Sequence, residues 1–365
     1  MQGHSSTQAV VTITPTTSPL DSLSVVSRRS GLDALASRLG ELQRLLADDL
    51  GELEVGLCQI HQQAQNDELD LAKRAAHHLL ARPGKRIRSL CVILGARLGG
   101  RLLDDDVRNL AIACELVHAA TLLHDDVIDE GTQRRGAPAS RMVFGNSASI
   151  LAGDHLLVEA LRLVEAAGPA WLLTQLLGVI SKMVAAEALQ LERRGRFDPS
   201  PDTYLEVIRG KSAALFRWGL QAGAVVAKMP ENHVELLGEV GLALGMAFQL
   251  VDDVLDLRGD ADVTGKNTLV DLREGKLTWP LIIAAQRHTA LCAQLQNIAI
   301  GQHDLTDERA QYVMEEVCAC GALDTTCEFA QAQADHARTL LTQLPITPAR
   351  RAMEIVIDSA VNRIL

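Results

Sequence analysis

The stretch Leu122-Leu123-His124-Asp125-Asp126-Val127-Ile128-Asp129 has a second acidic counterpart, Asp252-Asp253-Val254-Leu255-Asp256. Each cluster follows an apolar run. On a helix, the first and last aspartates of a cluster share one face because they are four residues apart. Three carboxylates beside a buried apolar stretch repel one another and are costly to desolvate. The two clusters therefore predict divalent cations that hold a polyanion between facing helices.

The remainder of the chain is predicted to be helical. Apolar residues recur at three- and four-residue spacing, as in Leu35, Leu39 and Leu42, and this period is typical of helices. Hydrophobic residues make up 47% and aromatic residues only 3% of the 365 residues, which favours packed helices over a β-sandwich or barrel. Breaks at proline and glycine separate about ten to thirteen helices. We expect one all-α domain over residues 31–365 and a disordered Ser/Thr-rich tail over residues 1–30.

Charge and cysteine usage exclude several classes of protein. The net charge of −11 argues against a nucleic-acid-binding protein. The seven cysteines show no paired CxxC spacing, so a reducing, cytoplasmic setting is expected. We find no long uninterrupted apolar run, so no transmembrane helix is expected. The tail lacks lysine and arginine before Arg28, which disfavours a transit peptide.

Basic residues accompany both acidic clusters. Lys85, Arg86 and Arg88 stand at a predicted helix start after Gly84, where backbone N–H groups and the helix dipole favour an anion. Arg134 and Arg135 follow the first cluster, and arginine forks match phosphate oxygens. Three further lysines occur near the clusters: Lys211, Lys266 and Lys276. Each group alone is more typical of a solvated surface or a local salt bridge, but together they predict two separate anion sites.

Two histidines lie on the helix that leads into the first cluster. His118 and His124 are seven apart and therefore on one side of that helix. We find no further soft ligands nearby, so a zinc site is not expected. His124 is interpreted as a hydrogen-bonding partner near the acids. For His118, spacing alone leaves open a phosphate contact or an internally satisfied core histidine.

Over residues 35–365 the chain resembles the trans-type polyprenyl diphosphate synthases. The matching segments, in chain order, are Gly84-Lys85-Arg86-Ile87-Arg88, Glu115-Leu116-Val117-His118, Leu123 to Asp129, Arg134-Arg135-Gly136, Gly210 to Leu215, Phe248 to Asp256, Gly265-Lys266 and Glu274 to Pro280. Departures are small: Pro83 and Ser89 flank the first basic motif where Gly and Pro are usual, and Ser212 replaces a common Thr. Every charge of the family pattern is retained.

The resemblance implies an all-α bundle of the isoprenoid synthase fold around a deep central cavity, usually as a homodimer. It also implies a Mg²⁺-dependent prenyltransferase that condenses isopentenyl diphosphate head-to-tail with an allylic diphosphate. About three Mg²⁺ ions are expected with substrate bound, and Mn²⁺ is expected to substitute. No nucleic acid and no membrane span are expected, although peripheral membrane contact would suit product release.

The resemblance also assigns roles to individual residues. The expected metal ligands are Asp125, Asp126, Asp129, Asp252, Asp253 and Asp256. The expected substrate-binding residues are Lys85, Arg88, His118, Arg134, Arg135, Lys211, Ser212, Gln249 and Lys266. Of these, Lys211, Gln249 and Lys266 are expected to take part in catalysis together with Asp125 and Asp252.

Product length is expected to depend on the helix that carries the first cluster. Ala120, Val117 and Ala113 lie five, eight and twelve positions before Asp125. In the resembling family a bulky residue near Ala120 limits the product to short chains, and here that residue is small. We therefore expect a C40–C50 product that serves as a quinone side chain. The alternative is a short- or medium-chain product of C15–C25.

Two other functions compete with this interpretation. A non-catalytic subunit of a heteromeric synthase would not need intact aspartate clusters. A class I terpene cyclase would not need the second anion site at Lys85, Arg88 and Arg135, and its cavity is usually more aromatic.

Overall fold

The computed structural model describes residues 33–65, 70–82, 84–258 and 269–362. Within these residues the fold is helical, apart from one two-stranded hairpin. The predicted all-α class is therefore confirmed. The expected disordered tail over residues 1–30 and the candidate site residue Lys266 lie outside the described residues.

The N-terminal half contains the following elements: α2 (Asp33–Leu45), α3 (Ala47–Gln65), α4 (Leu71–Leu80), α5 (Ile87–Leu98), α6 (Asp105–Ile128), β1 (Gln133–Arg134), β2 (Ala137–Pro138), α7 (Ser140–Phe144), α8 (Asn146–Ala167) and α9 (Ala170–Arg193). The C-terminal half contains α10 (Pro201–Ile208), the π-helix η1 (Arg209–Ala213), α11 (Ala214–Val226), α12 (Glu231–Arg258), α14 (Val270–Arg273), α15 (Trp279–Arg287), α16 (Thr289–Ala299), α17 (Asp307–Ala319), α18 (Ala322–Leu341) and α19 (Pro348–Val361). The described helices exceed the predicted ten to thirteen, because short ones such as α7 and α14 were not expected as separate elements.

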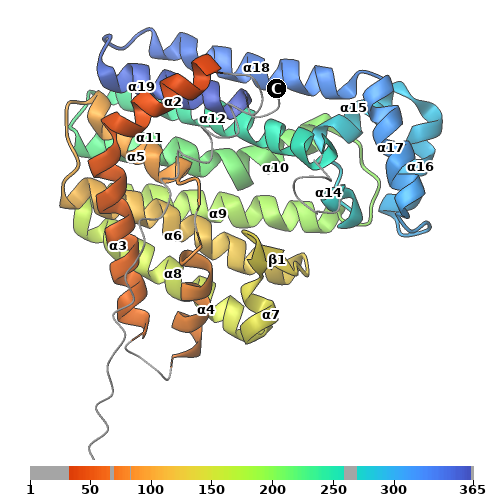
Figure 1. Ribbon diagram of the computed structural model, residues 1–365, viewed down its shortest axis with the longest axis horizontal. Helices are drawn as coiled ribbons and strands as arrows, with labels where there is room; N and C mark the ends of the chain where they lie inside the picture. The colour runs from red at the N-terminus through yellow and green to blue at the C-terminus, as the bar shows by residue number, and fades with distance from the viewer. Residues whose placement is uncertain (1–32, 66–69, 83, 259–268, 363–365) are drawn as a thin grey trace, which may run out of the picture.

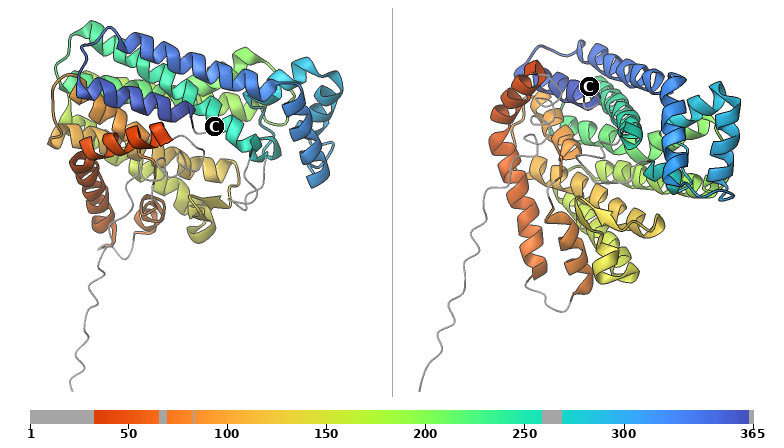
Figure 2. Two further views of the ribbon diagram at one scale, coloured as in Figure 1. Left: turned by 45° about the horizontal axis from the view of Figure 1, so that its top comes forward. Right: turned by 45° about the vertical axis from the view of Figure 1, so that its right-hand side comes forward.

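The long helices share one large hydrophobic core. Helix α6 packs along α8, α11 packs between α5 and α12, and α18 lies along α12 (Figure 1). Helix α3 stands at one end of the bundle, and α15, α16 and α17 gather at the other end in every view (Figure 2). This second group has a smaller core of its own, which includes Leu281, Leu291 and Val313. Both aspartate clusters are carried by long helices of the bundle, α6 and α12.

Close helix approach depends on glycine at the centre of the bundle. A Cβ atom at Gly223 of α11 would lie 2.1 Å from the carbonyl oxygen of Val92 on α5. No larger residue fits there unless the two backbones separate. The contact holds the middle of α5 directly against α11.

Two helices are long and apolar enough, by composition, to span a membrane. In α12 the apolar window is 72% buried inside the protein, as expected for a core helix, whereas in α9 it is only 22% buried. The sequence predicted no transmembrane helix, and length and composition alone do not decide that point, so it stays a prediction. That prediction counted only unbroken apolar runs, whereas both helices combine a few polar residues with a high mean hydropathy.

Candidate active site

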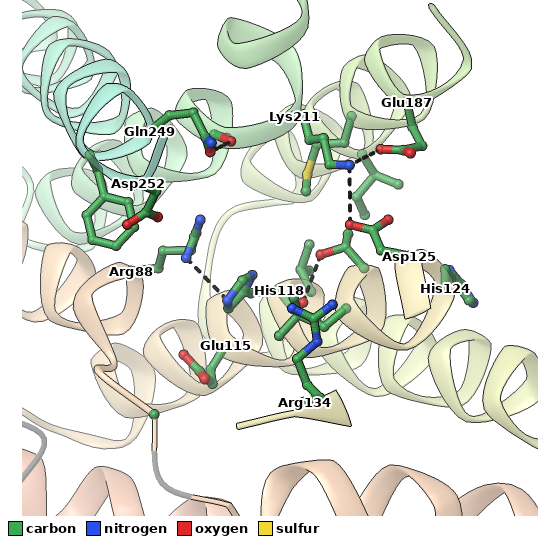
Figure 3. A pocket seen from close by; sticks show the side chains of 18 of the residues that line it. Arg88, Glu115, His118, His124, Asp125, Arg134, Glu187, Lys211, Gln249 and Asp252 are labelled. Carbon is green, nitrogen blue, oxygen red and sulfur yellow. Dashed lines mark hydrogen bonds and ion pairs between the residues drawn. The ribbon is translucent and has the colours of Figure 1, made fainter. Parts of the chain in front are cut away.

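A cavity of about 1020 Å³ lies between the aspartate clusters (Figure 3). Its walls come from the start of α5, from α6, α9 and α12, and from the π-helix η1. The predicted residues that line it are Lys85, Arg88, Val117, His118, Asp125, Arg134, Arg135, Lys211, Ser212, Gln249 and Asp252. The fold thus gathers residues from segments far apart in the chain around one space.

The first cluster divides along its helix. Asp125 faces the cavity, where its Oδ2 lies 3.4 Å from Nζ of Lys211. Burial raises the pKa of Asp125 to about 6, against the opposing effect of Lys211. Asp129 ends α6 one turn further on, and its carboxylate is held by Lys276 at 2.6 Å and Arg194 at 3.6 Å. Asp129 does not line the cavity, but its charge acts on Asp125, as expected for residues one helical turn apart.

Asp126 points elsewhere. Its Oδ1 accepts hydrogen bonds from Nε and NH2 of Arg134 at 2.9 and 2.6 Å, while its Oδ2 is buried without a hydrogen-bond partner. Burial raises the pKa of Asp126, while Arg134 acts in the opposite direction. In this conformation Asp126 anchors the hairpin that carries Arg134, and its predicted role as a metal ligand stays a prediction.

The second cluster is also divided. Asp252 lines the cavity on the wall opposite Asp125 (Figure 3). Asp253 is buried and accepts hydrogen bonds from the Tyr204 hydroxyl at 2.5 Å, Nε2 of Gln249 at 3.0 Å and the Trp279 backbone at 3.2 Å. Burial raises the pKa of Asp253 to about 7 despite these donors.

The last aspartate of the second cluster accepts hydrogen bonds from the first residues of a neighbouring helix. Asp256 accepts hydrogen bonds from the backbone N–H groups of Val270 and Asp271, at 3.1 and 3.4 Å, where the short helix α14 begins. In this conformation Asp253 and Asp256 are bound by protein donors rather than turned into the cavity. Their roles as metal ligands stay predictions.

Lys211 reaches the first cluster because of a local distortion of its helix. It lies in the π-helix η1, and such single-turn insertions are frequent at functional sites. A Cβ atom at the preceding Gly210 would lie 2.7 Å from Cβ of Ala186, so glycine lets η1 pack closely on α9. The ammonium group contacts Glu187 and Asp125 and donates to Oε1 of Gln190 at 3.0 Å. Burial alone would lower the pKa of Lys211, but Asp125 and Glu187 together raise it.

Two left-handed backbone positions hold the basic end of the cavity. Arg86 precedes α5 with φ 50°, and Arg135 has φ 50° in the two-residue turn between β1 and β2, followed by Gly136 with φ 74°. Positive φ at both central residues is the pattern of a type I′ turn, in which Asn-Gly is the usual pair. An arginine held in this region is strained, and such strain is concentrated at functional sites.

The guanidinium of Arg88 lies beside aromatic rings and a neutral imidazole. Its Cζ is 4.7 Å from the ring centre of Phe216, and its NH1 is 3.3 Å from Nε2 of His118. Burial, reinforced by Arg88 and other arginines, lowers the pKa of His118 well below its usual value, so its ring is neutral at pH 7. Burial also lowers the pKa values of Arg88 and Arg135. These two cations have lost much of their hydration, which favours the binding of an anion.

The side-chain amide of Gln249 has a fixed orientation. Its Oε1 accepts a hydrogen bond from the Ser212 hydroxyl at 2.7 Å, and its Nε2 donates to Asp253 at 3.0 Å. This pattern assigns the oxygen to the Ser212 side of the amide. Ser212 and Gln249 both line the cavity, so an oriented amide dipole lies near the space between the clusters.

Among the described residues, no three His, Cys, Asp or Glu side chains form a ready metal site. The cavity instead has one carboxylate from each cluster on opposite walls, Asp125 and Asp252. Carboxylate oxygens are ligands that Mg²⁺ accepts, and this ion completes its octahedral shell with water and phosphate oxygens. The donor set therefore fits a divalent cation that enters together with a phosphorylated ligand.

Only one of the three predicted chain-length residues lines the apolar part of the cavity. Val117 lines the cavity together with Thr121 and Leu122 of α6, whereas Ala120 and Ala113 are fully buried and do not line it. Other helices complete this part, through Leu157 of α8 and Ile180, Met183 and Val184 of α9. Among the described residues of the lining, Phe248 is the only phenylalanine, tyrosine or tryptophan, and it lies at the basic end near Lys85.

Sequence reasoning did not assign roles to three acids near the site. Glu115 meets the arginines of the basic end, Glu187 meets Lys211, and Asp271 packs beside Asp256. Burial, and next the charge of Asp256, raise the pKa of Asp271 to about 8. A signal was present for Glu115 and Glu187, because each is a single acid within an apolar helical run.

Comparisons with known proteins agree with this geometry. The model of the polyprenyl synthetase family matches residues 69–317. Octaprenyl diphosphate synthase of Escherichia coli K12 is 34% identical over 329 residues, which cover 89% of this chain and 99% of that enzyme.

Solved structures show the same similarity. A polyprenyl synthase from Caulobacter crescentus, in complex with calcium and isoprenyl diphosphate, has 36% identity and a TM-score of 0.80, covering 88% of this chain and 96% of that chain. A decaprenyl diphosphate synthase from Rhodobacter capsulatus has 34% identity and a TM-score of 0.81, covering 89% of this chain and 99% of that chain.

Proposed function

Since the chain belongs to the polyprenyl synthetase family, we propose that it condenses isopentenyl diphosphate head-to-tail with an allylic diphosphate to give a trans-polyprenyl diphosphate. The observation that carries the proposal is one cavity with two cationic ends. Lys211 lies beside Asp125 at one end, and Arg88 and Arg135 lie at the other. Two diphosphates can therefore bind at opposite ends, with their hydrocarbon parts in the shared apolar space.

The allylic diphosphate is assigned to the end between the aspartate clusters. Asp125, Asp129 and Asp252 would hold the divalent ions there, and Mg²⁺ is proposed as the natural ion, with about three bound and Mn²⁺ able to substitute. When bound, the ions neutralise the charge that develops on the diphosphate leaving group. Lys211 adds a fixed positive charge beside the same group, and Arg134 and Lys266 are proposed to assist.

Isopentenyl diphosphate is assigned to the basic end. Lys85, Arg88 and Arg135 would pair with its phosphate oxygens, and arginine forks suit this contact. The neutral ring of His118 donates from one nitrogen only, so it would orient rather than attract the anion.

The carbon–oxygen bond of the allylic substrate breaks to leave a cation that must be protected from water. Oε1 of Gln249 presents a partial negative charge near that cation. The apolar walls from α6, α8 and α9 exclude water from the growing chain. After the new carbon–carbon bond forms, the departing diphosphate is the proposed base for the proton that is lost.

A long product is proposed, of the C40–C50 class. Ligand cavities usually measure about 300–1,000 Å³, and this cavity of about 1020 Å³ is at the top of that range. Its apolar part has no phenylalanine, tyrosine or tryptophan among the described residues to act as a floor. The same feature disfavours a terpene cyclase, which needs aromatic faces to stabilise a folded cation.

A homodimer is proposed from the exposed face of α9. Leu177, Val184 and Leu191 are 48%, 64% and 50% exposed and are spaced seven residues apart, which is typical of a helix that packs on another helix. An antiparallel copy centred on Val184 would place Leu177 against Leu191 of the partner subunit. Val184 and Leu191 also line the cavity, so the second copy would close its side.

The dimer is tested with Leu177→Glu, because Leu177 lies on this face but outside the cavity lining. Light scattering after gel filtration should show a dimer for the parent and a monomer for the variant. A variant that remains fully dimeric would place the interface on another surface.

The reaction itself is tested by incubating the purified protein with radiolabelled isopentenyl diphosphate, Mg²⁺ and several allylic primers. Chromatography should show a labelled polyprenyl diphosphate that lengthens with time. Consumption of the allylic diphosphate without incorporation of label would favour a terpene cyclase, and no turnover without a second protein would favour a non-catalytic subunit.

A further inference from the structure

One buried carboxylate lies at the centre of the basic end of the cavity. The side chain of Glu115 on α6 is only 2% exposed, and its Oε1 is 2.5 Å from NH1 of Arg86 and 3.4 Å from NH2 of Arg135. Glu115 lies below the Arg88–His118 pair in Figure 3. A carboxylate with this little exposure is stable only when it is paired, and here two guanidinium groups meet one of its oxygens.

Arg86 is committed to acidic partners rather than to a ligand. Besides Glu115, its Nε donates to Oε1 of Glu54 on α3 at 2.9 Å. Burial alone would lower the pKa of Arg86, but Glu115 and Glu54 raise it overall. Arg86 therefore links α3 and α6 to the start of α5. Its left-handed backbone directly precedes Ile87, the first residue of the helix that carries Arg88.

Arg88 and Arg135 need a counter-charge when no ligand is bound. Both have lost hydration, and repulsion from Arg86 and Arg134 adds to that cost for Arg135. Glu115 is the foremost group that favours the charged form of each. A single buried acid thus lets several arginines occupy one end of the cavity before an anion arrives.

We propose that Glu115 is a positioning residue for the isopentenyl diphosphate site, which acts through Arg86 and Arg135. Glu54 extends this anchor to α3. The inference rests on the proposed function, because it assumes that the basic end binds isopentenyl diphosphate. Glu115 need not touch the ligand to have this effect, because its Oε1 holds Arg86 and Arg135.

Two opposing effects decide what Glu115→Gln does. Loss of a negative charge makes the basic end more attractive to an anion. The glutamine keeps an amide oxygen that can accept from Arg86 and Arg135, but it removes the negative charge, so both contacts to the guanidinium groups become weaker. Contacts to charged groups are the stronger kind, and the second effect should dominate if Glu115 positions the arginines.

The expected result is a rise of roughly 10-fold to 100-fold in the KM for isopentenyl diphosphate. The KM for the allylic primer should stay within about twofold of the parent, because the other end of the cavity is untouched. Turnover at saturating isopentenyl diphosphate should also be retained, since binding rather than chemistry is affected. Calorimetric titration with isopentenyl diphosphate alone should show the same loss of affinity.

A matched control separates positioning from stability. Asp49 is also a buried acid paired with an arginine, but it lies on α3 and outside the cavity lining. Its two carboxylate oxygens accept from Arg97 of α5 at 2.6 and 2.9 Å. Asp49→Asn should lower the thermal midpoint but leave the KM for isopentenyl diphosphate unchanged. If Glu115→Gln does not fold, Glu54→Gln takes its place, with a smaller rise in the same KM expected.

The outcomes distinguish the two proposals. If the parent protein does not bind isopentenyl diphosphate, the proposed function fails. If the parent binds it and both Glu115→Gln and Glu54→Gln bind equally well or more tightly, Glu115 is only a counter-charge and the positioning role is overturned.

Discussion

Nζ of Lys211 lies 3.4 Å from Oδ2 of Asp125, so a lysine in a π-helix meets the first aspartate of α6 at the wall of the cavity. Each member of this pair matches one part of a metal-diphosphate ligand. The lysine can pair with phosphate oxygens, and the carboxylate can bind the cation. Binding would then exchange one set of charge contacts for another and leave no charge unpaired.

The first prediction concerns the metal. Asp125→Asn, which keeps the shape of the side chain and removes its charge, should lower turnover by roughly 10²–10³-fold or more. Turnover of the parent should be abolished by EDTA and restored by excess Mg²⁺, as followed by incorporation of radiolabelled isopentenyl diphosphate. Asp358→Asn is the control, because Asp358 of α19 pairs with Arg38 of α2 and Arg338 of α18, outside the cavity lining. Near-normal turnover in EDTA would rule out this mechanism.

The second prediction is that the two substrates can be weakened separately. Arg88→Met should mainly raise the KM for isopentenyl diphosphate, because it removes a cation of the basic end. Lys211→Met should mainly lower the rate constant of ionisation, since that lysine lies beside Asp125. Steady-state assays with each substrate varied in turn check both effects. An Arg88→Met protein that bound isopentenyl diphosphate as tightly as the parent would contradict the assignment of the two ends.

The third prediction concerns the pH dependence of stability. The pKa of His118 is well below its ordinary value of about 6.5 in the folded protein because the ring is buried and surrounded by arginines. Below about pH 6.5 this histidine binds a proton in the unfolded chain but not in the folded chain. The unfolded state is therefore favoured as the pH falls, and the free energy of unfolding decreases. Below that pH the free energy of unfolding should fall less steeply with decreasing pH in His118→Asn than in the parent. The difference in slope should be up to about 1.4 kcal/mol per pH unit.

Urea unfolding at several pH values between about pH 7.5 and about pH 5 measures this slope. Asparagine keeps an acceptor for Arg88, so the variant tests the proton rather than the hydrogen bond. His303→Asn, which changes an exposed histidine, is the control and should follow the parent. The same slope in the parent and His118→Asn would mean that His118 is protonated in the folded state.

Much of the fold and of the site could be predicted from spacing. The three- and four-residue apolar period correctly indicated helices, because a helix buries one face. The same geometry explains why Asp125 and Asp129 share a side. It also explains why Asp126, one residue on, turns to Arg134 instead. The sequence motif contains three aspartates but does not show which of them face the cavity. Their orientation depends on the side chains that pack beside each one.

Other features depend on contacts that a linear pattern does not contain. The π-helix at Lys211 follows from the packing of Gly210 on α9, and the sequence there reads as an ordinary helix. The left-handed conformations of Arg86 and Arg135 run against residue preference and are held by their buried partners. Glu115 and Glu187 could be noticed as acids in apolar runs, but their partners come from distant segments.

The last prediction concerns product length, where two residues of α6 give different expectations. Val117 lies eight positions before Asp125, about 12 Å along the helix at about 1.5 Å per residue, and it lines the cavity. Ala120 is closer to the aspartates but is fully buried in the core and does not line the cavity. The family resemblance favours Ala120 as the controlling position, and the shape of the cavity favours Val117.

Val117→Phe should therefore shorten the product while the first condensation continues, because both charged ends of the cavity are unchanged. Ala120→Phe should instead overpack the core of α6, at a typical cost of about 1–3 kcal/mol, and lower the thermal midpoint. Leu102→Phe changes an exposed residue outside the cavity lining and outside the proposed dimer face, and it serves as the control. Chromatography of the radiolabelled products, together with thermal unfolding of each variant, provides the measurements.

The two variants discriminate between two paths for the growing chain. A path lined by α6, α8 and α9 meets Val117, Leu157 and Ile180, so only Val117→Phe blocks it. A path on the other face of α6 would need the core around Ala120 to open, and then Ala120→Phe would shorten the product and Val117→Phe would not. The second result would show that the growing polyprenyl chain opens the core beside Ala120. In the structure Ala120 is fully buried and closely packed, so that space would have to form as the product lengthens.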